Sequence, residues 1–478
     1  MIRSADFVDG ASAVDAWPRT RRPLPWLLAA FLAAIFLIPL EAVQMKVHLP
    51  FSSGFDRFFV AAIVAVWVLG MFLGRDSGIV RMRPKWWSVG VAALVFTAVA
   101  SIAVNVDTIT NLGEWQVAEK KVAVLLGLVA IFVVASLTLR VAELRPLMVL
   151  IVVLATITAL GTIYESRSGT NLFYETAKTA LAPVADVEAA STDVNPEVDQ
   201  GRPLITGPTR HPLSVTSLLG MSLAFAIVLA AVAPTFRRRL LWVLAAGVIV
   251  TGAALTQRKS GLVIPACALL ALLLIRPRQL LRLAPYGAAG LIVALLATPG
   301  MFSSLGELDR EDSRSSVEGR TSDYPAIVPD LLSNPILGRG YGTLDTLRQD
   351  TYRIFDNEYL GQVFQGGVLG LLAFLAFILV PVFVARGVLR SDNPLRGPPA
   401  LAAGAACFAF GVASALYDIF SFTAAPYLFC FVGAICVCAA SVERPATAAE
   451  LAPKPQPGRR RDQLSGLKPA GIGSPSGG

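Results

Sequence analysis

Long apolar runs recur along this chain and are separated by shorter segments that carry most of its charge. Each run is close to the ~20 residues that an α-helix needs to cross the hydrocarbon core of a bilayer. The 478 residues are 55% hydrophobic and only 15% charged, with a mean hydropathy of +0.63. A soluble domain of this length would carry much more charge. The chain is therefore predicted to be an integral membrane protein.

Twelve runs are long enough, or nearly long enough, to span a membrane. The predicted fold is all-α, a polytopic bundle of about 12 transmembrane helices with a large extracytoplasmic loop between the ninth and the tenth. The runs cover residues 26–44, 55–73, 86–104, 122–139, 145–164, 213–233, 239–256, 260–275, 283–298, 358–385, 398–417 and 421–440.

Basic residues predict the orientation of the bundle, because cytoplasmic loops carry an excess of Lys and Arg. If the N-terminus is cytoplasmic, 25 of the 41 basic residues but only nine of the 33 acidic residues lie inside. Both termini are therefore expected in the cytoplasm, with the protein in the cytoplasmic (inner) membrane. The predicted parts are a cytoplasmic N-terminus (1–25), membrane helices (26–164), an outer loop (165–212), more membrane helices (213–298), a large outer loop (299–357), the last membrane helices (358–440) and a disordered cytoplasmic tail (441–478).

Several classes of site are not expected. All five cysteines fall inside apolar runs, which favours neither a disulfide framework nor a zinc site. The acidic run at Asp309, Glu311 and Asp312 is interpreted as solvated surface, so no metal is predicted. The sequence contains neither a Walker loop nor a dinucleotide-binding fingerprint. No cofactor and no nucleic-acid partner are expected.

The stretch from Arg320 to Gly370 places polar and charged residues directly before a hydrophobic span. Within it, Asn334-Pro335 is followed by glycines at 338, 340 and 342. Proline restricts the backbone while the glycines permit positive φ, so this pattern predicts a turn that brings backbone amides close to a ligand.

These residues resemble a known family. The sequences NPILGRGYG, DNEYL and QGGVLGLLAF are similar to the C-terminal signature of the O-antigen ligase and polymerase family of polytopic membrane glycosyltransferases. The resemblance covers about residues 200–375. The family usually has a histidine before the Asn-x-Tyr, as its favoured group for activating the acceptor hydroxyl, and this chain has Asp356 there.

The resemblance implies a general base for glycosyl transfer to a hydroxyl. Asp356 and Glu358 are the catalytic candidates, and each could instead serve only as a cap or first-turn acid of the following helix. His211 is a further candidate to replace the family histidine, although a lone histidine is more often structural. Glu41 and Asp418 lie near outer span ends and face either a cavity or the membrane interface.

Arginines near the outer span ends are candidate ligands of a diphosphate, because a guanidinium binds oxyanions in bidentate fashion and stays charged. Arg258 could instead snorkel to the membrane interface, and the arginines of the large loop could be solvated. The diphosphate-binding candidates are Arg202, Arg210, Arg258, Arg320 and Arg339.

What the resemblance implies is an inverting, metal-independent glycosyltransferase with a polyprenyl diphosphate-linked glycan as donor. The acceptor is a glycan, a lipid or a protein, and the residues do not separate a ligase from a polymerase. The alternative is a transporter or flippase for the lipid-linked sugar, which usually needs polar residues along its whole path. The spans are nearly free of charge at mid-depth, which favours the enzyme.

Overall fold

The computed structural model describes residues 16–46, 54–72, 79–82, 86–188, 204–256, 260–277, 331–343, 357–389 and 393–445, together with residues 281, 285 and 328. This part of the chain is predominantly helical, and the predicted all-α class is confirmed. Six of its helices are long and apolar enough to cross a membrane. They are α3 (Phe55–Phe72), α6 (Trp115–Thr138), α7 (Val141–Ser168), α10 (Pro212–Ala231), α17 (Glu358–Leu389) and α18 (Gly397–Ser414).

Further apolar helices lie beside these six and make the chain a multi-pass membrane protein. Four of them are shorter, namely α2 (Pro23–Leu37), α4 (Val89–Val104), α12 (Ser260–Ile275) and α19 (Ala424–Ala440). Another, α11 (Phe236–Ala254), begins with three arginines. Every one of these helices coincides with an apolar run of the sequence. The ninth predicted run, at 283–298, lies almost entirely outside the described residues.

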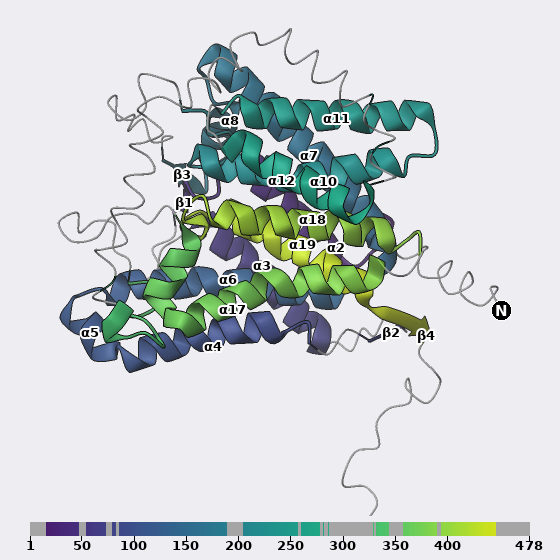
Figure 1. Cartoon of the computed structure of the whole chain (residues 1–478). Helices are drawn as coiled ribbons and strands as arrows, with labels where there is room; N and C mark the ends of the chain where they lie inside the picture. Colours follow the sequence, from purple (N-terminus) through teal and green to yellow (C-terminus); the bar gives the residue numbers. More distant parts are fainter. Residues whose placement is uncertain are drawn as a thin grey trace, which may run out of the picture.

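Helices α10, α18 and α19 are largely buried in the bundle. Every residue from Ala424 to Ala439 in α19 is buried, and α10 is buried along most of its length. Figure 1 shows α18 and α19 between a group formed by α7, α10, α11 and α12 and a second group formed by α4, α6 and α17. Alanine and glycine dominate α18, and small residues of this kind allow membrane helices to approach closely.

The first predicted span ends earlier than expected. Helix α2 stops at Leu37 because Ile38 precedes Pro39, and the residue before a proline disfavours the helical conformation. The chain then forms β1 (Val43–Met45), which pairs antiparallel with β3 (Ala185–Val187). The predicted outer loop 165–212 is thus partly regular, since it also holds α8 (Leu172–Leu181).

A second small sheet lies at the opposite end of the bundle from the β1–β3 pair (Figure 1). Strand β2 (Ile79–Met82) pairs antiparallel with β4 (Val442–Pro445). The charge pattern predicts a cytoplasmic position for both of these segments and an outer position for β1 and β3. Each sheet therefore joins segments that are predicted to lie on one side of the membrane.

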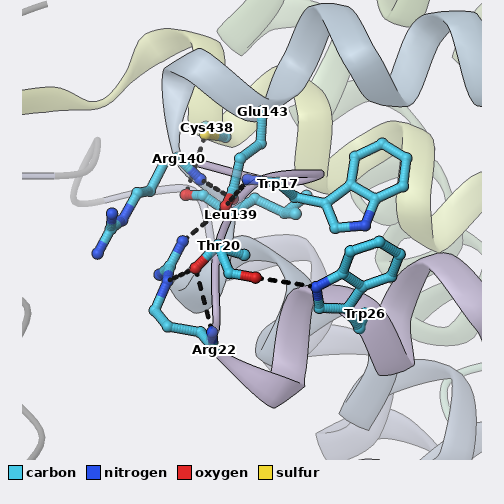
Figure 2. A network of polar contacts seen from close by, with 8 residues as sticks. All are labelled: Trp17, Thr20, Arg22, Trp26, Leu139, Arg140, Glu143 and Cys438. Carbon is cyan, nitrogen blue, oxygen red and sulfur yellow. Dashed lines mark hydrogen bonds and ion pairs between the residues drawn. The ribbon is translucent and has the colours of Figure 1, made fainter. Parts of the chain in front are cut away.

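The N-terminal segment is fastened to the start of α7 by the fully buried Glu143 (Figure 2). Its Oε1 accepts a hydrogen bond from the Trp17 amide at 3.1 Å and pairs with Arg22 at 2.6 Å. Its Oε2 accepts the Arg140 amide at 2.9 Å. Because each of these donors satisfies a buried carboxylate, the network holds the N-terminal segment against α7.

Candidate functional site

The candidate site is built on a break in α17. Gly367 has φ 63° and ψ −161°, so the helical hydrogen-bond pattern stops there and then restarts. The segment 331–343 supplies the missing partners: the amides of Arg339 and Gly340 donate to the carbonyls of Phe364 and Gln365 at 3.0 and 3.1 Å. Non-helical backbone at membrane depth is tolerated only where its polar groups are satisfied in this way.

The segment 331–343, called the docked loop below, binds the break in α17. This contact corrects the expected role of the glycine-rich turn. Its amides were predicted to face a ligand, but those of Arg339 and Gly340 bind α17, and that of Gly342 donates to Gln365 Oε1 at 2.8 Å. A broken helix presents carbonyls without intrahelical partners, and the turn satisfies them. The glycines therefore position a loop on a helix.

The C-terminal end of α4 holds the same segment from the other side. Ser101 Oγ donates to the Gln365 carbonyl at 2.6 Å, and Asn105 Nδ2 donates to the Gly338 carbonyl at 3.0 Å. All four residues are buried, so these contacts join α4 to the segment 331–343 and to the break in α17.

Arg339, a predicted diphosphate ligand, lies inside the protein. Its side chain is 8% exposed and pairs with Glu114, 1% exposed, at 3.0 Å. Its guanidinium also lies 5.8 Å from the centroid of the Phe364 ring. The buried pairing with Glu114 gives Arg339 a structural role, and its role as a diphosphate ligand stays a prediction.

Glu358, a predicted catalytic residue, is the first residue of α17 and is 2% exposed. Its Oε1 accepts from Gln362 Nε2 at 2.7 Å, and its Oε2 accepts the Phe420 amide at 3.1 Å. The helix cap is Asn357, whose Oδ1 accepts the amides of Tyr359 and Leu360 at 3.0 and 3.4 Å. Glu358 therefore does not cap α17. Its side chain is oriented by Gln362 of the same helix and by the Phe420 amide of another segment.

Two further polar side chains converge on Glu358. The Asp418 side chain lies close to that of Glu358. The Tyr341 phenol interacts electrostatically with both carboxyl groups. Burial, reinforced by these two acids, raises the pKa of Tyr341 above its ordinary value. The hydroxyl therefore stays protonated, and it makes no hydrogen bond within the described residues.

The connection between α18 and α19, residues 415–423, contacts several of the candidate residues. It contains the 3-10 helix η2 (Ile419–Ser421), and it contacts Glu358 on one side through Phe420 and Asp418. On another side the Tyr417 hydroxyl bonds Ser217 of α10 at 2.8 Å. Of this segment, only Asp418 stood out in the sequence. The available signal was one acid among aromatic residues, Tyr417 to Phe422, between two apolar spans.

A second loop, residues 204–211, reaches the site from the start of α10. Glu165 at the end of α7 accepts the amides of Thr206 and Gly207 at 3.2 and 2.9 Å. Asn171, the cap of α8, donates to the Gly207 carbonyl at 2.8 Å, and the Tyr174 hydroxyl donates to the Thr209 carbonyl at 3.2 Å. These contacts set the position of the residues that follow.

His211 caps α10 and lies against the α18–α19 connection. Its Nδ1 accepts the Leu213 amide at 3.2 Å, and its ring centroid is 5.1 Å from that of Phe422. Because Nδ1 is an acceptor, the neutral ring carries its proton on Nε2. In this arrangement His211 is a hydrogen-bond donor, whereas a general base needs an unprotonated nitrogen facing the substrate.

Glu41 joins the two segments that hold His211 and Phe422. Its Oε1 accepts the amides of Thr423 and Ala424 at 2.7 and 3.3 Å, and its Oε2 accepts the Arg210 amide at 3.2 Å. Burial raises the pKa of the Glu41 carboxyl, while these backbone donors oppose that shift. The Arg210 side chain is 53% exposed and faces Glu188 at 3.9 Å. Of the predicted diphosphate ligands among the described residues, Arg210 is the accessible one.

Four predicted site residues lie outside the described residues, namely Asp356, Arg202, Arg258 and Arg320. Their roles stay predictions. Asp356 directly precedes the described cap Asn357, and Arg202 precedes the described loop by two residues. Among the described residues, no group of three His, Cys, Asp or Glu side chains is arranged to hold a metal.

Comparison with known families identifies the central part of the chain. Residues 248–375 match the family model described as O-antigen ligase, which confirms the resemblance seen in the sequence. The match contains α12, the docked loop and the break in α17. Arg210, His211 and the α18–α19 connection lie outside it. No curated protein matches the chain.

Proposed function

We propose that this membrane protein, with its O-antigen ligase domain at residues 248–375, is a glycosyltransferase acting on the outer face of the cytoplasmic membrane. The donor is a polyprenyl diphosphate-linked glycan, and the protein either ligates it to an acceptor or polymerises it in the synthesis of cell-surface polysaccharide. The proposal keeps the topology of about 12 spans with both termini inside. The large loop between the ninth and tenth spans then lies outside.

The observation that carries the proposal is the placement of Glu358. The docked loop and the break in α17, both within the matched domain, put Glu358 beside Asp418 and Tyr341. Two carboxyl groups this close together can share a proton, beside a Tyr341 hydroxyl that stays protonated. Such a carboxyl pair is what a hydroxyl acceptor needs as its bond to the sugar forms.

The reaction we propose is an inverting transfer without a metal. The acceptor oxygen attacks the anomeric carbon while the bond from that carbon to the diphosphate oxygen breaks. The acceptor proton passes to a carboxylate, and polyprenyl diphosphate leaves with its electron pair. Arg202, Arg210, Arg258 and Arg320 are the proposed ligands of the leaving group, because oriented cations at a site of low dielectric stabilise developing charge by several kcal/mol.

Glu358 and Asp356 are the alternatives for the base. Asn357 caps α17, so Asp356→Asn keeps the cap and tests whether the Asp356 carboxylate takes part in the reaction. Glu358→Gln keeps the size of a side chain that accepts from Gln362 and Phe420. The variant that lowers turnover of bound donor identifies the base. Glu119→Gln, at an exposed position of α6, is the matched control.

The deciding experiment is reconstitution of the full-length protein in nanodiscs with a polyprenyl diphosphate oligosaccharide and an acceptor. We expect glycan transfer and release of polyprenyl diphosphate, both unchanged by a chelator. Full activity in both Glu358→Gln and Asp356→Asn would remove these carboxylates from the mechanism. Donor translocation in liposomes without transfer would contradict the glycosyltransferase and support a flippase.

A further inference from the structure

The Glu41 side chain joins two loops that are far apart in the sequence. Glu41 lies in the short segment between α2 and β1. Its Oε1 accepts the amides of Thr423 and Ala424 at 2.7 and 3.3 Å, and its Oε2 accepts the Arg210 amide at 3.2 Å. These donors lie 382, 383 and 169 residues away along the chain. One carboxylate therefore holds the loop before α10 against the connection before α19.

Glu41 also takes the place of a cap at the start of α19. Thr423 is the N-cap residue, but its side chain makes no capping hydrogen bond, and its buried Oγ1 has no hydrogen-bond partner among the described residues. The carboxylate instead accepts the amides of Thr423 and Ala424, and a negative charge is favourable at this end of a helix. One turn further on, Asp56 accepts the Tyr427 hydroxyl at 3.1 Å. The start of α19 is therefore fixed by acids from two other segments.

The contacts of Glu41 lie on either side of a pair of rings. Arg210 directly precedes His211, and Thr423 directly follows Phe422. The imidazole and the Phe422 ring are in contact, with centroids 5.1 Å apart and planes at 30°. Because the imidazole Nδ1 accepts a backbone amide of α10, the neutral ring carries its proton on Nε2. The direction of that N–H therefore depends on how the two loops are held together.

We infer that Glu41 is a positioning residue for His211, an assignment that rests on the proposed function. By joining the two loops, Glu41 holds the imidazole against Phe422 and fixes the direction of its Nε2–H. A donor held in this way suits an oxygen of the diphosphate leaving group, since hydrogen bonds to charged acceptors are strong. A displacement of about 1 Å at a reacting group lowers a rate by roughly 100-fold. Glu41 lies outside the matched domain at residues 248–375.

The first test is a double-mutant cycle on the full-length protein in nanodiscs, with Glu41→Gln, His211→Asn and both together. Glutamine keeps the size of the side chain but has one acceptor oxygen, so it accepts amides on one side and presents N–H to the other. We expect Glu41→Gln alone to lower kcat roughly tenfold or more. In the His211→Asn background the same change should alter kcat by no more than about twofold, because the group that Glu41 positions is gone. Glu175→Gln, at an exposed position of α8, is the matched control and should keep kcat.

The second test observes the imidazole directly and needs no donor. The chain has two histidines, so His48→Gln leaves His211 as the only one. In that background, NMR of the protein labelled with ¹⁵N-histidine should give one set of ring signals with the proton on Nε2. Glu41→Gln should shift or split these signals, and Glu175→Gln should leave them unchanged. Glu41→Asp, which keeps the charge but is too short to reach both loops, replaces Glu41→Gln in both tests if the latter does not fold.

The outcomes separate a positioning role from a purely structural one. Equal losses of kcat from the Glu41 change in both backgrounds would show that Glu41 only stabilises the fold. Normal kcat in His211→Asn would leave no group to position and would also overturn the assignment. Ring signals that do not change in the Glu41 variant would contradict the positioning role alone. Absence of transfer by the wild-type protein would contradict the proposed function, and the assignment would fall with it.

Discussion

Gly338 and Gly367 pack backbone against backbone where the docked loop meets the break in α17. A Cβ at Gly338 would lie 2.6 Å from the Gly367 nitrogen, and a Cβ at Gly367 would lie 2.4 Å from the Ile336 carbonyl. Both residues have positive φ, of 64° and 63°. Each glycine is therefore required twice, once for its backbone conformation and once for the close approach.

The first prediction concerns these glycines. Gly338→Ala and Gly367→Ala should each destabilise the docked loop by at least a few kcal/mol, since a Cβ meets backbone atoms that cannot move aside. Glycan transfer activity should be lost when the docked loop no longer binds α17. The measurement is thermal unfolding in detergent together with activity in nanodiscs.

The matched control for that prediction is the neighbouring Gly366. A Cβ there has nothing within 4 Å, so Gly366→Ala should keep both stability and activity. Equal tolerance of alanine at 338, 366 and 367 would show that the loop does not dock on α17 as described.

The second prediction separates two roles of Arg339. If its pairing with Glu114 is structural, Arg339→Gln should destabilise the protein by about 3–5 kcal/mol, because it leaves a buried carboxylate without its cation. Replacing both residues, as Arg339→Gln with Glu114→Gln, should restore much of the stability and also the activity. The readouts are thermal unfolding and donor KM.

A diphosphate ligand would behave differently in the same cycle. The double variant would then be stable and inactive, with weakened donor binding. That outcome would return Arg339 to the set of diphosphate ligands predicted from the sequence.

The third prediction concerns His211. Asparagine is a good N-cap, so His211→Asn should keep α10 intact. If the imidazole acts on substrate as a donor through Nε2, turnover should fall more than tenfold with little change in thermal stability. Steady-state kinetics and thermal unfolding of the same preparation measure both quantities.

Phe422→Leu serves as the companion variant, because it removes the ring that lies against His211 and leaves the cap hydrogen bond. Normal turnover in His211→Asn would show that the residue is only a cap. Glu358 and Asp356 would remain the candidate bases.

The fourth prediction concerns orientation in the membrane. In a background without the five native cysteines, a cysteine at Ser315 should react with a membrane-impermeant thiol reagent in intact cells, since the large loop is predicted outside. A cysteine at Ser465 should react only after permeabilisation. The opposite labelling pattern would place the candidate site on the cytoplasmic side and contradict the proposed function.

Hydropathy alone located the apolar helices among the described residues of this protein. Each described apolar helix coincides with an apolar run, because backbone inside a bilayer must satisfy its own hydrogen bonds and the helix does so locally. The motif around 334–342 and 356–370 likewise indicated the family, which the match to residues 248–375 confirms. Composition and short motifs carry this information because it depends on neighbouring residues in the chain.

Tertiary structure decided what the polar residues do. Arg339 and Glu358 look alike in sequence as charged residues beside a span, yet one is paired inside the bundle with Glu114 and the other is aimed at the α18–α19 connection. The partners lie 225 and 62 residues away along the chain. Only folding brings such partners together, because a desolvated charge is stable only where a distant segment supplies its hydrogen bonds.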